Sequence, residues 1–175
     1  MLPGTASIPA TDSRRLQAAT ATGRRIVQLV REDLRPSKIL TPAAFDNAIR
    51  TLLALGGSTN AVVHLIAMAG RRGIRLPLSR FDELAQTTPF LVNLMPSGRH
   101  LMDAFDAAGG VPAVMAEIRN LLQLDSLTVS GRTVGENIQR SRSFNRDVIA
   151  ASEKPLSAGG SLAVLTGNLA PSGAI

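Results

Sequence analysis

The stretch LGGSTNAVVHLIAMA, residues 55–69, is the most informative part of the chain. Glycine reaches positive φ angles without steric cost, so Gly56 and Gly57 predict a sharp turn. The polar residues 58–60 follow with the side-chain oxygens that cap helix N-termini. The apolar residues beyond them lie on almost every side of the helix axis, which is typical of a buried helix. The sequence therefore predicts a buried central helix that begins at a glycine turn.

The start of this helix is a candidate binding site. A helix N-terminus has four unpaired backbone N–H groups and a partial positive charge, an arrangement that binds anions. Gly57, Ser58, Thr59 and Asn60 are therefore candidates for residues beside a ligand. The alternative is that the polar side chains only cap the helix, and the residues alone leave both interpretations open.

A second turn, MPSGR at residues 95–99, has the same character. Ser97 supplies a hydroxyl and Arg99 a fixed cation suited to a carboxylate or phosphate. Capping is again the alternative. Neither turn has the Gly-Lys-Ser/Thr ending of a Walker loop or the glycine pattern of a dinucleotide site.

Composition limits the class of protein. The 175 residues are 45% hydrophobic, enough for one substantial core, and no apolar run is long enough to cross a membrane. The net charge of +6 comes from scattered arginines, and the aromatic content of 3% provides no base-stacking platform. We therefore expect no binding to nucleic acid or membranes. The absence of cysteine excludes disulfides and thiolate metal sites, and with no secretory signal visible we expect a cytoplasmic protein.

Caps and periodicity predict a series of helices. Asp12 or Ser13 is expected to begin a helix that ends near Leu34, and Thr41 with Pro42 begins the next. The expected inner stripe of the first helix consists of Leu16, Ala19, Gly23, Ile26, Val27 and Val30.

Two capping boxes and three short strands complete this prediction. Residues 133–136 have the capping-box pattern, and residues 79–82 resemble it with Asp82 in place of Glu. Short apolar runs at residues 90–94, 127–129 and 161–166 predict strands.

The two histidines suggest little chemistry. His64 lies on the central helix and is expected to be a hydrogen-bonded core residue. His100 lies at a helix start, where it is more exposed and could face a ligand. Neither histidine has an acidic partner at metal-ligand spacing, so no metal site is expected within the chain.

Seven blocks in series resemble the dihydroxy-acid and sugar-acid dehydratase superfamily, and they cover nearly the whole chain. They are LPGTASIPA (2–10), GGSTNA (56–61), NLMPSGR (93–99), AGGVPAV (108–114), LTVSGRT (127–133), NRDVI (145–149) and GNLAP (167–171). The first block is more similar to the aldonic-acid branch than to the branched-chain amino-acid branch.

The resemblance implies a hydro-lyase that converts a 2,3-dihydroxy acid or an aldonic acid to the 2-keto-3-deoxy acid. In that family an iron–sulfur cluster acts on the leaving hydroxyl, a magnesium ion holds the substrate and a serine takes the proton. The residues that perform these roles lie upstream and downstream of the matching region. The resemblance thus implies no catalytic residue and no metal ligand here, and Ser58 and Ser97 are not the serine base. Gly57, Ser58, Thr59, Asn60, Ser97 and Arg99 are expected near the substrate or the iron–sulfur cluster.

The expected fold class is α/β, the mostly helical part of an α/β/α N-terminal domain plus the first strand of a C-terminal β-barrel. Residues 1–140 are assigned to the first domain, 141–159 to a linker and 160–175 to the start of the barrel. Such a fragment is expected to bind no cofactor and catalyse no dehydration alone, and to self-associate because its helices lack the sheet they cover. The intact enzyme is expected to be a homo-oligomer that binds a small hydroxy acid. The alternative is a non-enzymatic remnant that survives as a helical interaction module.

Overall fold

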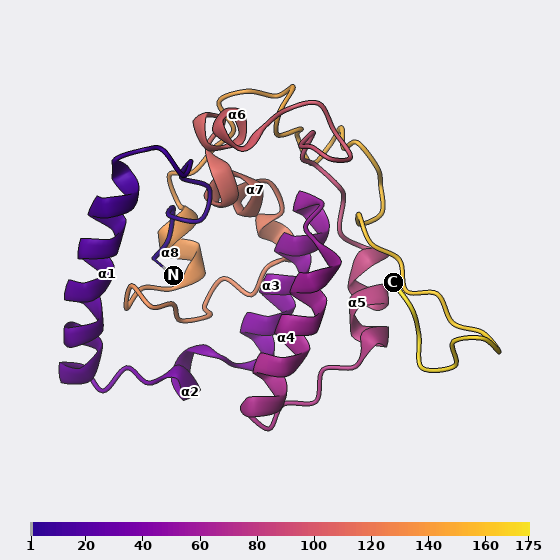
Figure 1. The fold of residues 1–175 in the computed structure, drawn as a ribbon, viewed down its shortest axis with the longest axis horizontal. Helices are drawn as coiled ribbons and strands as arrows, with labels where there is room; N and C mark the ends of the chain where they lie inside the picture. Colours follow the sequence, from indigo (N-terminus) through magenta and orange to yellow (C-terminus); the bar gives the residue numbers. More distant parts are fainter. Residues whose placement is uncertain (1) are drawn as a thin grey trace.

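Helices joined by long irregular segments make up the chain (Figure 1). The computed structural model describes residues 2–175. In chain order the helices are α1 (Arg14–Arg31), α2 (Pro36–Ile39), α3 (Pro42–Leu55), α4 (Thr59–Arg71), α5 (Leu78–Ala85), α6 (Met102–Ala107), α7 (Gly110–Glu117), a 3₁₀ turn (Arg119–Leu121) and α8 (Val134–Ile138).

Helix α3 connects the two hydrophobic cores. It begins as predicted, with the Thr41 hydroxyl accepting from the Ala44 N–H at 3.3 Å and Pro42 in the first turn. Ile49 and Leu53 are buried against α4 and α5, whereas Ala54 belongs to the second and larger core. The larger core is formed mainly by Leu91, Val92, Phe105, Ala108, Ala113, Val114, Ile118, Val148 and Ile149. Helix α3 therefore has buried residues on two sides.

The predicted strand at residues 90–94 is present only as isolated bridges, which are antiparallel for Phe90 with Ser157 and Val92 with Ile149 and parallel for Leu94 with His100. The Leu91 N–H donates to the carbonyl of Ala54 at 2.9 Å, so this segment is also hydrogen-bonded to the last turn of α3. A strand needs several paired neighbours to extend. Over residues 2–175 the backbone pairs only at single bridges, which confirms the helical part of the predicted class.

The barrel strand expected at residues 161–166 is not formed. The segment makes one bridge, Leu165 with Ala174, within a loop that extends away from the helices (Figure 1). A barrel strand is stable only beside neighbouring strands of a closed sheet. The division of the chain at residues 141 and 160 stays a prediction, and Val148 and Ile149 between them are fully packed in the larger core.

The prediction of a buried central helix was wrong. Helix α4 begins as expected, with the Ser58 hydroxyl accepting from the Asn60 N–H at 3.2 Å, but only Val62 and Ala69 are buried. Val63 is 66% exposed, and His64 is exposed instead of lying in the core. The helix packs on α3 from one side only, which leaves its opposite side open to solvent.

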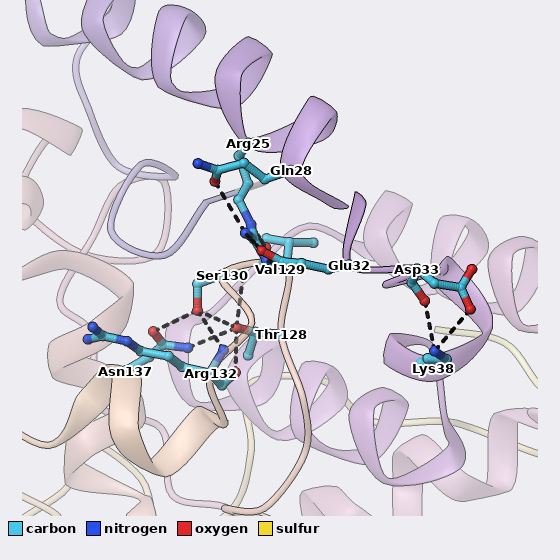
Figure 2. Close-up of polar contacts among 10 residues, drawn as sticks. All are labelled: Arg25, Gln28, Glu32, Asp33, Lys38, Thr128, Val129, Ser130, Arg132 and Asn137. Atoms are coloured by element: carbon cyan, nitrogen blue, oxygen red, sulfur yellow. Dashed lines mark hydrogen bonds and ion pairs between the residues drawn. The ribbon is translucent and has the colours of Figure 1, made fainter. Parts of the chain in front are cut away.

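The expected burial of the inner stripe of α1 was also wrong, because none of the residues of this helix is buried. Helix α1 lies at one edge of the molecule (Figure 1). Arg25 Nε donates to the Val129 carbonyl at 2.7 Å, and its guanidinium also pairs with Glu32 at the end of the same helix (Figure 2). At the start of the helix Arg14 pairs with Asp106 at 2.6 Å. Helix α1 is thus attached to the body through Arg14 and Arg25, and its residues Ile26, Leu29 and Val30 line an apolar hollow together with Ile39 and Val129.

The two predicted capping boxes had different outcomes. At α8 the Glu136 N–H donates to the Thr133 hydroxyl at 3.2 Å, and the Thr133 N–H donates to the Glu136 carboxylate at 2.7 Å, as predicted. Helix α5 instead begins at Leu78 after Pro77, so Ser79 lies inside the helix and caps nothing. None of the helices described is long and apolar enough to cross a membrane.

A set of three glycine substitutions tests the turn after α3. Gly56 has φ +77°, and a Cβ there would lie 2.7 Å from Cε2 of Phe90. We expect Gly56→Ala to lower the free energy of unfolding by about 2 kcal/mol or more, from backbone strain and the ring contact together. Gly73 has φ +69° but open space around it, so Gly73→Ala should cost only about 1 kcal/mol.

The matched control is Gly70→Ala inside α4, where neither constraint applies and a gain of about 0.5–1 kcal/mol is expected. Urea denaturation followed by circular dichroism measures all three variants. Equal effects of Gly56→Ala and Gly73→Ala would show that the contact with Phe90 is unimportant.

The α8 capping box predicts a pH dependence of stability. The pKa of Glu136 lies below its ordinary value of 4.5, first because the Thr133 backbone N–H donates to the carboxylate. A lowered folded-state pKa contributes stability above pH 4.5, and this contribution is lost as the pH falls through the lowered value. Glu136→Gln retains the reach-back hydrogen bond without titrating. We expect urea denaturation between about pH 5 and pH 2 to show a smaller loss of stability for this variant; equal losses would contradict the assignment.

Candidate functional site

The turn at residues 95–99 is held closed by its own backbone. The Gly98 N–H donates to the Leu94 carbonyl and the Met95 N–H to the His100 carbonyl, both at 2.8 Å. The Met95–Pro96 peptide bond is cis. A Cβ on Gly98 would overlap the backbone of Asn93 and Leu94, so only glycine fits there. The turn therefore presents Ser97 and Arg99 on a fixed, exposed loop.

Asn93 joins this loop to a distant segment. Its side-chain oxygen accepts from the Arg99 N–H at 3.0 Å, and its side-chain nitrogen donates to the Asp147 carbonyl at 3.1 Å. The Asn93 N–H also donates to the Val148 carbonyl at 2.9 Å. One asparagine thus fixes residues 97–100 relative to residues 145–148.

Asp147 receives two basic side chains from the loop. Its carboxylate lies 3.2 Å from Nη2 of Arg99 and 2.8 Å from Nε2 of His100. Because Arg99 and Asp147 are well exposed, their ion pair contributes only about 0–1 kcal/mol of stability. A carboxylate bonded to an imidazole also fixes the orientation of the ring. The principal effect of Asp147 is therefore to position Arg99 and His100.

A hollow of about 400 Å³ lies beside this group, lined by Leu94, Met95, His100, Leu101, Met102 and Asp103. Most of its wall is apolar, and His100 and Asp103 are the two polar residues among those that line it. Binding sites for small molecules have this character, with an apolar wall and a few polar groups that fix orientation. Arg99, next to this hollow in sequence, provides a cation suited to a carboxylate.

The first candidate turn has a simpler structure. Gly56 is in the left-handed conformation, and the N–H groups of Gly56 and Gly57 both donate to the Leu52 carbonyl at 3.1 Å. Ser58 caps α4, and Thr59 and Asn60 are exposed at its first turn. The helix start is therefore open to solvent, as an anion site requires.

The structure brings together some of the predicted site residues and not others. Ser97 and Arg99 share one loop with His100. Gly56 contacts the ring of Phe90, three residues before Asn93, so both turns flank residues 90–94. No hydrogen bond or ion pair among residues 2–175 joins residues 57–60 to the Asn93–His100 loop. The two turns remain neighbouring candidates and not one formed site.

Reasoning from sequence missed Asn93 and Asp147 as site residues. Asp147 is 47 residues from His100, so no local spacing rule relates them. One signal was available: residues 145–147 are polar and directly precede the apolar pair Val148 and Ile149. An apolar pair that enters the core places the polar residues before it at the edge of that core.

The residues described do not fit a metal cofactor. In residues 2–175 no three His, Cys, Asp or Glu side chains are grouped as a metal ion would require. The sequence also lacks the cysteines that hold iron–sulfur clusters. Asp147 is already occupied by Arg99 and His100. We therefore derive no catalytic step through a metal held by this chain.

Comparison with known families identifies the class of protein. Residues 1–137 match the dihydroxy-acid/6-phosphogluconate dehydratase N-terminal family. The chain belongs to this dehydratase family.

Individual relatives agree with this result. The chain is 53% identical over 176 residues to L-arabinonate dehydratase of Rhizobium leguminosarum bv. trifolii, covering 99% of this chain and 30% of that protein. It is 47% identical to dihydroxy-acid dehydratase of Methanosarcina barkeri and 49% identical to that of Ignicoccus hospitalis, covering 99% and 100% of this chain and 32% of each relative. The chain thus spans about a third of the length of these relatives.

The double role of Asn93 gives a testable prediction. We expect Asn93→Ala to lower the free energy of unfolding by about 1–3 kcal/mol, because it removes two hydrogen bonds and leaves their partners unpaired. The amide proton of Arg99 should exchange faster with solvent, as measured by NMR. The control is Asn120→Ala at an exposed position of the 3₁₀ turn, which should change neither quantity. Unchanged exchange at Arg99 in Asn93→Ala would contradict the role of Asn93.

Proposed function

We propose that this chain is part of a hydro-lyase that removes water from an aldonic acid or another 2,3-dihydroxy acid to give a 2-keto-3-deoxy acid. The observation that carries the proposal is the 53% identity to L-arabinonate dehydratase across 99% of the chain. The match of residues 1–137 to the dehydratase family supports the same reaction class. A cytoplasmic location and a small hydroxy-acid substrate belong to this proposal.

The contribution of this chain is to bind and orient the substrate. Arg99 binds the substrate carboxylate, because its exposed guanidinium presents paired donors on a fixed loop. Ser97 and His100, on the same loop, bind substrate hydroxyls. Asp147 keeps the two basic side chains in place.

The groups that act on the leaving hydroxyl and on the C2 proton belong to other parts of a longer protein. A metal acting as a Lewis acid lowers the barrier to loss of hydroxide, and the family resemblance assigns this role to an iron–sulfur cluster with magnesium. Since the residues described do not fit either group, the chain on its own is expected to be inactive.

A hybrid protein tests the reaction class. This chain replaces the matching segment of L-arabinonate dehydratase of Rhizobium leguminosarum, and 2-keto acid formation is measured with L-arabinonate and, separately, with a 2,3-dihydroxy acid. We expect the hybrid to form the 2-keto acid from at least one of them and the 175 residues alone to form none. A hybrid with native circular dichroism and native iron content that acts on neither acid would contradict the proposal.

Arg99→Ala in the same hybrid tests the binding role. Loss of a hydrogen bond to a charged group costs about 1.5–3 kcal/mol, so KM should rise about tenfold or more with a smaller change in kcat. The control is Arg75→Ala, which removes an exposed arginine between α4 and α5. An unchanged KM would show that Arg99 does not bind the substrate, and it would not contradict the proposed reaction class.

A further inference from the structure

One carboxylate at the candidate site is open to a ligand. Asp103, in the first turn of α6, is exposed and lines the hollow beside Arg99 and His100. One of its carboxylate oxygens, Oδ1, accepts from the Ala104 N–H at 2.8 Å. Among residues 2–175 no basic side chain pairs with Asp103, whereas Asp147 already pairs with Arg99 and His100. Oδ2 of Asp103 is therefore available to a molecule in the hollow.

The rest of the lining has no place for a second anionic group. Apart from Asp103 and His100, the lining residues are all apolar: Leu94, Met95, Leu101 and Met102. Of the described residues that line the hollow, none is a lysine or an arginine. Phosphate groups are bound in proteins mainly by such cations. The wall of the hollow therefore suits the carbon chain of a ligand and does not suit a phosphate group.

The charge of Asp103 distinguishes ligands by their tails. An ionised carboxylate only accepts hydrogen bonds, so it binds hydroxyl groups, which donate. A phosphate ester carries a charge of about −1.5 to −2 at neutral pH and is repelled by a carboxylate. An alkyl tail offers the carboxylate no donor. Repulsion of the wrong ligand is a general way for a site to gain specificity.

We propose that Asp103 is a specificity-determining residue of the candidate site, which selects acids with a hydroxylated and unphosphorylated tail. The inference rests on the proposed function, in which Arg99 binds the substrate carboxylate. The rest of the acid then occupies the hollow, with its carbon chain against the apolar wall and a tail hydroxyl donating to Oδ2 of Asp103. The substrate class is an aldonic acid, and neither a phosphorylated sugar acid nor a dihydroxy acid with an alkyl tail.

Asp103 also has a local role that the test must separate from this one. An acidic residue in the first turn of a helix interacts favourably with the helix dipole, and the bond to the Ala104 N–H lies in the same turn. Loss of a purely local role would loosen the hollow and weaken the binding of every acid. Loss of charge selection instead weakens the binding of one acid and strengthens that of another. Asp103→Asn separates the two roles, because the amide keeps an oxygen for the Ala104 N–H and removes the charge.

The hybrid with L-arabinonate dehydratase tests the inference with two acids that differ only at the tail, L-arabinonate and L-arabinonate 5-phosphate. The KM of L-arabinonate and the inhibition constant of its phosphate ester are measured. We expect Asp103→Asn to raise the KM about fivefold, because a hydrogen bond to a charged group is replaced by a neutral one. We expect the inhibition constant to fall about tenfold or more, because the repulsion of the phosphate is removed.

The matched control is Asp125→Asn, which removes the same charge from an exposed position outside the hollow and should change neither constant. If both constants rise in Asp103→Asn, or if neither changes, the inference is overturned and the reaction class is unaffected. Activity on an alkyl-tailed 2,3-dihydroxy acid without activity on L-arabinonate would have the same consequence. A hybrid with native iron content that acts on neither acid would contradict the proposed function itself, and with it this inference.

Discussion

The packing of the α3 C-terminus against residues 90–94 is the constraint on which the structure depends. Gly56 ends α3 in a left-handed conformation that only glycine adopts easily, and the ring of Phe90 occupies the space of its missing side chain. Beside this contact, the Leu91 N–H donates to the Ala54 carbonyl. Since α3 contributes to both cores, this contact fixes the position of one core relative to the other.

The candidate site follows from that packing. Residues 90–92 are held by α3 on one side and by Ile149 and Ser157 on the other, so Asn93 emerges at a fixed point between two chain segments. From there it positions both Arg99 and Asp147. The site is thus formed by loops on a packed support, an arrangement common where a protein binds small molecules.

Predictions from local pattern were right at three helix starts and wrong at α5, where Ser79 lies inside the helix and caps nothing. Thr41, Ser58 and the Thr133–Glu136 capping box begin their helices as expected, because each cap depends on residues within one turn. Predictions of burial were wrong for α1 and α4. An apolar stripe at helical spacing predicts a helix and a face that needs a partner, but it does not identify that partner. In α1 the face turned to the body is the one with Arg14 and Arg25.

The sequence by itself determined the helices, most of their ends, the glycine turn at residue 56 and the dehydratase family, because these depend on residue types at short spacing or on blocks in series. Only the tertiary structure decided that Asp147 lies against Arg99 and His100, since 47 residues separate the two segments and a packed core brings them together. It also decided that the strand at residues 90–94 remains a set of single bridges. Strand extension and side-chain proximity depend on neighbours distant in sequence, and those are determined by packing.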